Sequence, residues 1–247
     1  MISRFFCPSP LTFGATVELP AEVAHHAVNV LKVGAGETAI LFDGRGGEWL
    51  ATLSPAGKSS KPALYATLTE FNERDNESPL HITLVQALPA SDKMDWVVQK
   101  AVELGVARIQ PVMTQRSVMR LSGERATRRV THWRNIAIAA CEQSGRNRVP
   151  DVAPIIALPR YLGQAVESAA ECRFICAPGA TQSLRERQAP ALPITLLVGP
   201  EGGFDESELL AATTAGFQPI RLGPRVLRTE TAGVAALAAI MALWGDL

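Results

Sequence analysis

The sequence has no net charge and no long hydrophobic run, and both absences exclude classes of protein. Lysine plus arginine and aspartate plus glutamate each number 24 in 247 residues, so a nucleic-acid surface would require charge gathered in one region. No apolar run approaches the roughly 18 to 20 residues that span a bilayer. The first ten residues also lack the apolar core of a signal peptide, so we expect a cytoplasmic protein.

Cysteine and histidine are scarce and are not spaced as metal ligands. The four cysteines form no C-x-x-C pair, and Cys172 and Cys176 flank an apolar run that is typical of a strand. The four histidines are scattered along the chain. We therefore expect buried, reduced thiols and no metal site.

A polar break at residues 72–79 separates two textures of sequence. Before it, short β-like runs alternate with turn residues, which predicts a small β-barrel over residues 1–72. After it, apolar strand-like runs alternate with helical patterns, which predicts an α/β domain with a parallel sheet over residues 73–247. The predicted strands are 38–42, 48–53 and 63–68 in the first part, and 81–88, 107–113, 173–177, 194–198 and 219–222 in the second.

Two predicted helices differ in their surroundings. The helix after the first strand of the second domain has a possible cap at Ser91 and a terminator at Gly105, with an apolar stripe between them. The last helix, from Thr231 to Gly245, contains no charged residue. A helix that is apolar all round is buried on more than one side, so it is either threaded into the fold or covered by a second subunit.

A basic block is hidden by the neutral total. Residues 108–148 contain nine arginines and no lysine, against only two glutamates. On a helix that begins near Ala126, Val130 and Trp133 lie on the apolar face, and Arg125, Arg128 and Arg129 lie on another. Arginine suits bidentate contact with phosphate, so a nucleic-acid partner and an ordinary solvated helix face both remain open.

The glycine-rich turn Gly199-Pro-Glu-Gly-Gly203 follows an apolar strand and has the outline of a phosphate cradle. It lacks the lysine of a P-loop and the glycine spacing of a dinucleotide-binding fingerprint. Asp205, Glu206 and Glu208 then crowd the start of the next helix and would repel an anion. The loop better suits a ligand that carries positive charge or hydroxyl groups.

A second loop repeats this arrangement after the next strand. Residues 222–232 read Leu-Gly-Pro-Arg-Val-Leu-Arg-Thr-Glu-Thr-Ala and again lead from a strand through a Gly-Pro turn into a helix. Two such loops at the carboxyl ends of neighbouring parallel strands would form one crevice, where ligands commonly bind. Taken singly, each is also compatible with an ordinary strand-to-helix turn.

The two loops together resemble the second and third motifs of the RsmE family of SPOUT methyltransferases. The resemblance extends, in the same order, to residues 99–106, 116–118 and 139–150, and more loosely to 25–33 and 42–44 in the first domain. Lys32 stands where the family commonly has arginine.

This resemblance implies an α/β SPOUT domain with a trefoil knot, preceded by a PUA-like barrel that binds RNA, in a homodimer. It implies transfer of a methyl group from S-adenosylmethionine to N3 of a uridine in 16S rRNA, within the small ribosomal subunit and without a metal.

The resemblance also suggests site residues. The methyl donor is expected at Pro178, Val198, Gly199, Pro200, Glu201, Gly202, Gly203, Leu222, Gly223, Leu227, Thr229 and Thr231. The catalytic candidates are Arg146, Arg228, Glu230 and Glu142, because methylation at N3 requires a proton acceptor or a cation that stabilises the uracil anion. The expected RNA contacts are Arg4, Lys32, Arg116, Arg120, Arg125, Arg128 and Arg129.

Three alternatives stay open. Glu230 could merely cap the last helix and pair with Arg228. The whole chain could be a non-catalytic RNA-binding protein that uses only the barrel and the arginine block. It could also be a Rossmann-like nucleotide enzyme, although the phosphate signature of that class is missing.

Overall fold

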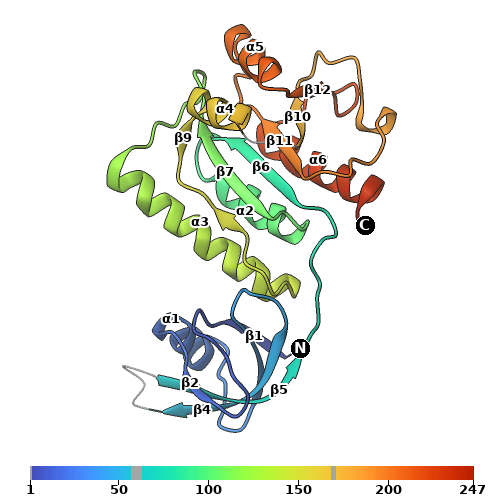
Figure 1. The fold of residues 1–247 in the computed structure, drawn as a ribbon. Coiled ribbons are helices and arrows are strands. Elements are labelled where there is room, and N and C mark those ends of the chain that lie inside the picture. The colour runs from blue at the N-terminus through green and yellow to red at the C-terminus, as the bar shows by residue number, and fades with distance from the viewer. Residues whose placement is uncertain (1, 57–62, 168–170) are drawn as a thin grey trace. The chain divides into compact units, whose positions relative to one another are not determined.

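The structure, a computed structural model, describes residues 2–56, 63–167 and 171–247 and divides into two compact units (Figure 1). The first unit comprises Met1–Glu77 together with Cys141–Val149. The second comprises Ser78–Ala140 together with Pro150–Leu247. A segment distant in sequence therefore completes the first unit.

The first unit is built on a five-stranded sheet in the order β1-β3-β4-β5-β2. Its strands are β1 (Ser3–Phe6), β2 (Thr16–Glu18), β3 (Thr38–Phe42), β4 (Glu48–Ala56) and β5 (Ala63–Asn72). All pairs are antiparallel except that of β1 with β3. A short helix, α1 (Ala21–His25), runs on into a π-helical turn, η1 (His26–Val30), and the inward side chains include Phe5, Leu41 and Leu53.

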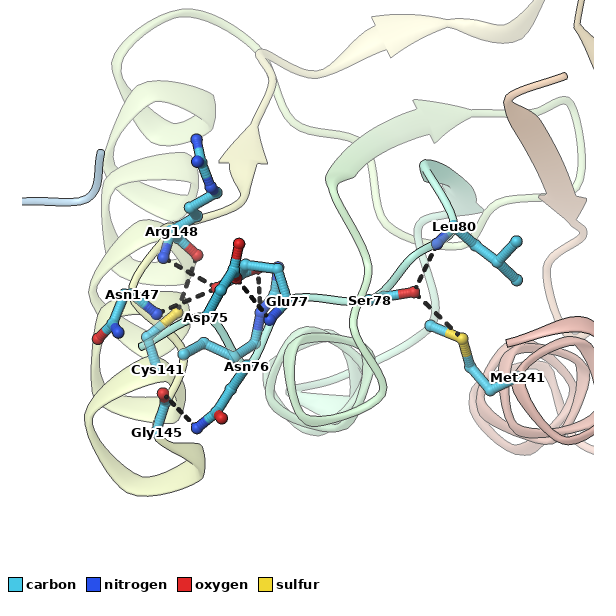
Figure 2. Close-up of polar contacts among 11 residues, drawn as sticks. Asp75, Asn76, Glu77, Ser78, Leu80, Cys141, Gly145, Asn147, Arg148 and Met241 are labelled. Atoms are coloured by element: carbon cyan, nitrogen blue, oxygen red, sulfur yellow. Dashed lines mark hydrogen bonds and ion pairs between the residues drawn. The ribbon is translucent and has the colours of Figure 1, made fainter. Parts of the chain in front are cut away.

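Glu77 fixes the segment 141–149 within the first unit, as Figure 2 shows. Its Oε1 accepts hydrogen bonds from the backbone N–H groups of Asn147 and Arg148, each at 3.0 Å, and its Oε2 lies 2.6 Å from Nη2 of Arg146. Asn76 Nδ2 donates to the carbonyl oxygen of Gly145 at 3.1 Å. The polar residues 72–79, which mark a break in the sequence, thus include side chains that bond specifically to the segment 141–149.

The second unit contains a parallel sheet, as the sequence predicted. Its order is β12-β10-β11-β6-β7-β8, with β9 also paired to β7. The strands are β6 (Ile82–Ala87), β7 (Arg108–Met113), β8 (Asp151–Val152), β9 (Ile156–Ala157), β10 (Cys172–Cys176), β11 (Ile194–Val198) and β12 (Gln218–Ile220). The prediction that the two glycine loops follow neighbouring strands is wrong, because β10 lies between β11 and β12.

Helices cover both faces of this sheet (Figure 1). The helices are α2 (Lys93–Glu103), α3 (Gly123–Ser144), α4 (Leu158–Glu167), α5 (Glu206–Thr214) and α6 (Thr229–Trp244), with a short 3-10 turn η2 (Leu184–Glu186). Side chains of α4 and α5 pack with Val85, Ile175 and Leu197 on one face. On the other, α6 packs beside α2 and over Leu84 and Val198.

Two expectations about these helices have definite outcomes. Ser91 is not the cap of α2: Asp92 occupies that position without a side-chain cap, and Ser91 has a left-handed backbone with φ +60°. On α3, burial of Val130 and Trp133 confirms the predicted apolar face.

The apolar helix α6 is buried on one side only within this chain. Gly233, Ala236, Leu237, Ile240 and Met241 are buried, whereas Ala242 and Leu243 are exposed. Among the helices that the structure describes, none is long and apolar enough to cross a membrane.

Candidate functional site

A cavity of about 1240 Å³ opens in the second unit at the carboxyl ends of three strands. It is lined by the loops that follow β10, β11 and β12, together with the start of α6. Carboxyl ends of parallel strands meet at one edge of a sheet, which is why loops from separate segments converge there. The loop after β10 lies between the two glycine loops and was represented in the sequence prediction only by Pro178.

Most of the predicted ligand-binding residues line this cavity. They are Pro178, Val198, Gly199, Pro200, Glu201, Gly203, Leu222, Gly223, Leu227 and Thr229. Gly202 and Thr231 do not. Gly202 faces Arg116 instead, since a Cβ added there would lie 3.2 Å from the Cβ of that arginine.

Two glycines of the first loop have identifiable reasons to be glycine. A Cβ at Gly199 would lie 2.9 Å from the ring of Phe204, so the loop can pack on that ring only without a side chain. Gly203 has φ +67°, a left-handed conformation that other residues rarely adopt. A Cβ at Gly203 would meet no protein atom within 4 Å, so the wall leaves room for a ligand there.

Buried hydrogen bonds join the first loop to the start of α6. The hydroxyl of Thr229 donates to the carbonyl oxygen of Gly199 and accepts from Nε2 of Gln86 at 2.9 Å. Gln86 is fully buried on β6, and its Nε2 also donates to the carbonyl oxygen of Ala87. No local pattern indicates a role for Gln86, because its partner lies 143 residues further along the chain.

The outer side of the first loop is held by polar groups as well. Nη1 of Arg116 donates to the carbonyl oxygen of Gly202 at 3.0 Å. Asp205 caps α5 by accepting from the N–H of Glu208 at 2.8 Å, and the Glu208 carboxylate accepts in return from the N–H of Asp205 at 3.1 Å. This capping box explains why acidic residues gather at the start of α5.

Glu201 lines the cavity, but its carboxylate is engaged by protein groups. Its Oε1 accepts hydrogen bonds from the backbone N–H of Ala90 at 2.9 Å and from Nζ of Lys93 at 3.1 Å. Partial burial raises the pKa of Glu201, but these bonds outweigh it and leave the pKa below its ordinary value. The interpretation that this carboxylate is free to attract a cationic ligand therefore needs revision.

Cys176, at the end of β10, also lines the cavity. Burial raises the pKa of its thiol to about 12, so the thiol stays protonated and is a poor nucleophile at neutral pH. Among the described residues, all four cysteines are free and no group of three or more potential ligands could hold a metal ion.

Of the four catalytic candidates, Arg228 alone lines the cavity. This arginine is exposed, and no hydrogen bond or ion pair of its side chain occurs within the described part of the chain. Glu230 does not line the cavity, and its Oε1 lies 3.4 Å from Nζ of Lys93. Arg228 is itself the N-cap position of α6, so Glu230 neither caps the helix nor pairs with Arg228.

The other two candidates belong to the first unit and have partners there. The guanidinium of Arg146 is buried against Glu77. The carboxylate of Glu142 accepts a hydrogen bond from the N–H of Phe6 at 2.9 Å, and burial raises the pKa of Glu142.

The expected RNA contacts are mostly on the surface, with one clear exception. Arg4 is turned inward, where it pairs with Glu48 at 2.6 Å. Lys32 is exposed and has a left-handed backbone with φ +59°. In the second unit, Arg129 pairs with Asp92, and Arg120 donates to the carbonyl oxygen of Gln115. Arg125 and Arg128 are exposed on α3.

Comparisons with known proteins agree with this architecture. Residues 76–241 match the family model described as an RNA methyltransferase domain, and residues 19–61 match that of an RNA methyltransferase PUA domain. The chain is 35% identical to ribosomal RNA small subunit methyltransferase E of Synechocystis, over 93% of this chain and 74% of the relative. It is 32% identical to the Bacillus subtilis protein of the same name, over 91% and 89%.

Two solved structures resemble the chain over its whole length. One is ribosomal RNA small subunit methyltransferase E from Neisseria gonorrhoeae bound to S-adenosylmethionine, with 42% identity, TM-score 0.91 and full coverage of both chains. The other is a Legionella pneumophila methyltransferase in complex with the same cofactor, with 35% identity, TM-score 0.93 and full coverage of both chains.

Proposed function

This chain belongs to the RNA methyltransferase family that includes ribosomal RNA small subunit methyltransferase E, and from that membership we propose the reaction that follows. The protein uses S-adenosylmethionine to methylate ribosomal RNA of the small subunit. The observation that carries this function is the 42% identical neighbour, which binds the donor and matches the chain over its full length. The cavity at the three strand ends supplies a site of suitable chemistry for that donor.

The residues of the cavity fit S-adenosylmethionine. Adenine needs an apolar slot, and Leu222, Leu227 and Phe217 contribute apolar side chains to the lining. Ribose hydroxyls need hydrogen-bonding groups, which the backbone of the two glycine loops can present where no side chain intervenes. When bound, the donor supplies a methyl group on a sulfonium centre.

We further propose that the accepting atom is N3 of a uridine, as the family resemblance implies. The N3–H bond must break, its proton must go to a base or to solvent, and the new bond forms as the methyl group leaves sulfur. Arg228 is placed to stabilise the negative charge that the uracil ring acquires, because this exposed residue lines the cavity and its guanidinium is not committed to another side chain among the described residues.

We propose that Glu230, Arg146 and Glu142 act by positioning other groups and do not contact the uracil ring. Each side chain is engaged within its own unit, by Lys93, Glu77 and the N–H of Phe6 respectively. These contacts support positioning roles for all three.

RNA binding is proposed for two regions. Residues 1–72 would form the PUA-like RNA-binding domain, which the family match at 19–61 supports, and residues 73–247 the catalytic domain. In the catalytic domain, the exposed guanidinium groups of Arg125 and Arg128 on α3 suit phosphate contact. Arg4 is less suited, because it already pairs with Glu48.

We also propose a homodimer in the cytoplasm, with the trefoil knot of the family. The support for the dimer is α6, whose second face carries only uncharged residues and exposes Ala242 and Leu243. Such a face is stabilised when a second copy covers it.

The role of Arg228 is tested with Arg228→Gln. Turnover of S-adenosylmethionine with undermodified small subunits should fall about 100-fold, the usual cost of removing one group that stabilises developing charge, while the donor Kd stays unchanged. Arg221→Gln is the matched control, since Arg221 is exposed in the same segment and does not line the cavity. Equal turnover in the two variants would remove Arg228 from the mechanism. Absence of any transfer by the wild-type protein would favour a non-catalytic RNA-binding role.

A further inference from the structure

Lys93, the first residue of α2, lies between two carboxylates that come from distant parts of the chain. Its Nζ is 3.1 Å from Oε1 of Glu201 and 3.4 Å from Oε1 of Glu230. The side chains of Lys93 and Glu201 are each 31% exposed and that of Glu230 is 16% exposed, so the three groups are partly shielded from water. One ammonium group therefore contacts both acids.

These two acids belong to the two glycine-loop walls of the cavity. Glu201 sits in the loop between β11 and α5 and itself lines the cavity. Glu230 is the second residue of α6 and directly follows Arg228 and Thr229, which line the cavity from the other loop. Lys93 is absent from the lining, so it contacts both walls from outside.

The turn before α2 adds a second contact to the first wall. The backbone N–H of Ala90 donates to the same Glu201 oxygen at 2.9 Å. The next residue, Ser91, has φ +60°, a conformation that costs a non-glycine residue about 1 kcal/mol or more. Such strained residues are retained where the surroundings require them, and here the strained turn and Lys93 hold the same carboxylate.

Lys93 is positively charged at neutral pH, and removing this charge would destabilise the ionised carboxylate of Glu230. The hydrogen bond to Glu201 raises the pKa of Lys93, so the ammonium form persists at neutral pH. Oε2 of Glu230 is buried and has no hydrogen-bond partner within the described residues. Lys93 is thus the cation that compensates this carboxylate.

We propose that Lys93 is a positioning residue for the methyl donor: by bridging Glu201 and Glu230, it holds the two glycine-loop walls at the spacing that S-adenosylmethionine requires. The inference rests on the proposed function only for the identity of the donor. Preorganised walls favour binding because less conformational freedom is lost when the ligand enters.

The test compares Lys93→Met with Lys93→Arg and with Lys100→Met. Lys100 lies on the same helix, is similarly exposed and pairs with Glu103 at 2.8 Å, so its loss removes a comparable ion pair away from the cavity. Calorimetric titration with S-adenosylmethionine should show a Kd about tenfold higher for Lys93→Met. Lys93→Arg should restore most of the affinity, and Lys100→Met should bind as the wild-type protein does.

A second measurement uses the donor-free protein. The N–H of Gly203 donates to the carbonyl oxygen of Pro200, so its hydrogen exchange reports how firmly the first loop is held. Exchange at Gly203 should be faster in Lys93→Met and unchanged in Lys100→Met. The double variant Lys93→Met/Glu230→Gln should bind the donor no more weakly than Lys93→Met, because both changes break the Lys93–Glu230 contact and Glu230 does not line the cavity.

The outcomes separate this inference from the proposed function. If Lys93→Met matches the wild-type protein in both donor Kd and exchange at Gly203, Lys93 has no positioning role. If the wild-type protein does not bind S-adenosylmethionine, the proposed function fails, whereas the exchange experiment still decides whether Lys93 holds the loop. Should Lys93→Met fold poorly, Glu201→Gln weakens the same contact from the other side, and exchange at Gly203 should then be faster in Glu201→Gln than in the wild-type protein.

Discussion

Thr229 shows how a single side chain can organise the cavity. Its hydroxyl connects Gln86 on β6 with the carbonyl oxygen of Gly199, so three segments meet at one oxygen atom. Gln86 and Thr229 are both buried, so water cannot easily replace a lost bond between them.

Replacing Thr229 with valine keeps the shape and removes this hydroxyl. The free energy of unfolding should fall by about 1 to 3 kcal/mol, because buried polar partners lose a hydrogen bond, and the donor Kd should rise about tenfold as the Gly199 loop loosens. Urea denaturation and calorimetry measure the two effects. Thr214→Val is the control, since within the described residues the Thr214 hydroxyl bonds to the Leu210 carbonyl oxygen of its own helix, and equal values for both variants would remove Thr229 as an organiser of the cavity.

Glu201 should give the protein a defined pH dependence. Its pKa is lowered in the folded state, so its contribution to stability is present above its ordinary pKa and is lost as pH falls through the lowered value. The pKa of Lys93 is raised, so the contribution of this partner is present below its ordinary value, about 10.4, and is lost at higher pH.

The measurement is the difference in unfolding free energy between wild-type protein and Glu201→Gln across pH. The difference should be level from about pH 5 to pH 10 and should shrink below about pH 4, where the carboxylate becomes protonated. A difference that persists unchanged in acid would mean that the charge of Glu201 does not matter to the fold.

The residue scale is also where prediction from sequence was least complete. The glycine loops could be predicted because Gly-Pro turns between apolar strands and helices are visible in a local window. The roles of Gln86 and Lys93 could not, because their partners lie more than 100 residues away and only the folded sheet brings them together. Arg116 had a visible charge, but nothing local indicated that it would bind loop carbonyl oxygens.

At the scale of elements, α6 packs closely against the sheet at Gly233, next to Gln86, Leu84 and Val198. A Cβ added at Gly233 would lie 2.9 Å from Oε1 of Gln86, so a side chain there would displace an amide group that is bonded to Thr229 and Ala87. Helix propensity alone would favour alanine at this position by about 1 kcal/mol, and packing overrides it.

Gly233→Ala should therefore lower the free energy of unfolding and weaken donor binding, since Gln86 must move away from Thr229. Gly163→Ala, in α4, is the matched case, because a Cβ there meets nothing within 4 Å and should raise stability by up to about 1 kcal/mol. Denaturation curves of the two variants should shift in opposite directions. A stabilised Gly233→Ala would show that α6 leaves room for a side chain between Gly233 and Gln86.

Elements were more predictable than contacts. The predicted strand 194–198 coincides with β11 and the strand 38–42 with β3, because both are short apolar runs bounded by turn residues. The placement of β10 between β11 and β12 was not predictable, since the order of strands in a parallel sheet does not follow their order in the chain. The short strands β8 and β9 are too brief to leave a periodic signal.

At the scale of the whole molecule, the two units carry different features, although the chain as a whole has no net charge. The cavity proposed for the donor lies in the second unit, where Arg125 and Arg128 are also exposed on α3. The match to an RNA methyltransferase PUA domain lies in the first unit. Both features belong to a protein that must hold a small donor and a large anionic substrate at once.

The proposed homodimer predicts a molar mass in light scattering of twice that of one chain. Leu243→Glu should reduce the mass to that of a monomer, because a charge would be placed in the apolar face of α6. Leu210→Glu is the control, since Leu210 is an even more exposed leucine on α5. A monomeric wild-type protein, or a dimer that tolerates Leu243→Glu, would contradict this use of α6.

The proposed reaction is tested most directly by locating the transferred methyl group. Small ribosomal subunits that lack the modification are incubated with the protein and methyl-labelled S-adenosylmethionine, and the labelled nucleotide is mapped by mass spectrometry. We expect one labelled uridine in the small-subunit rRNA, methylated at N3, with one S-adenosylhomocysteine released per methyl group. Label at another atom or in another RNA, or no transfer at all, would contradict it.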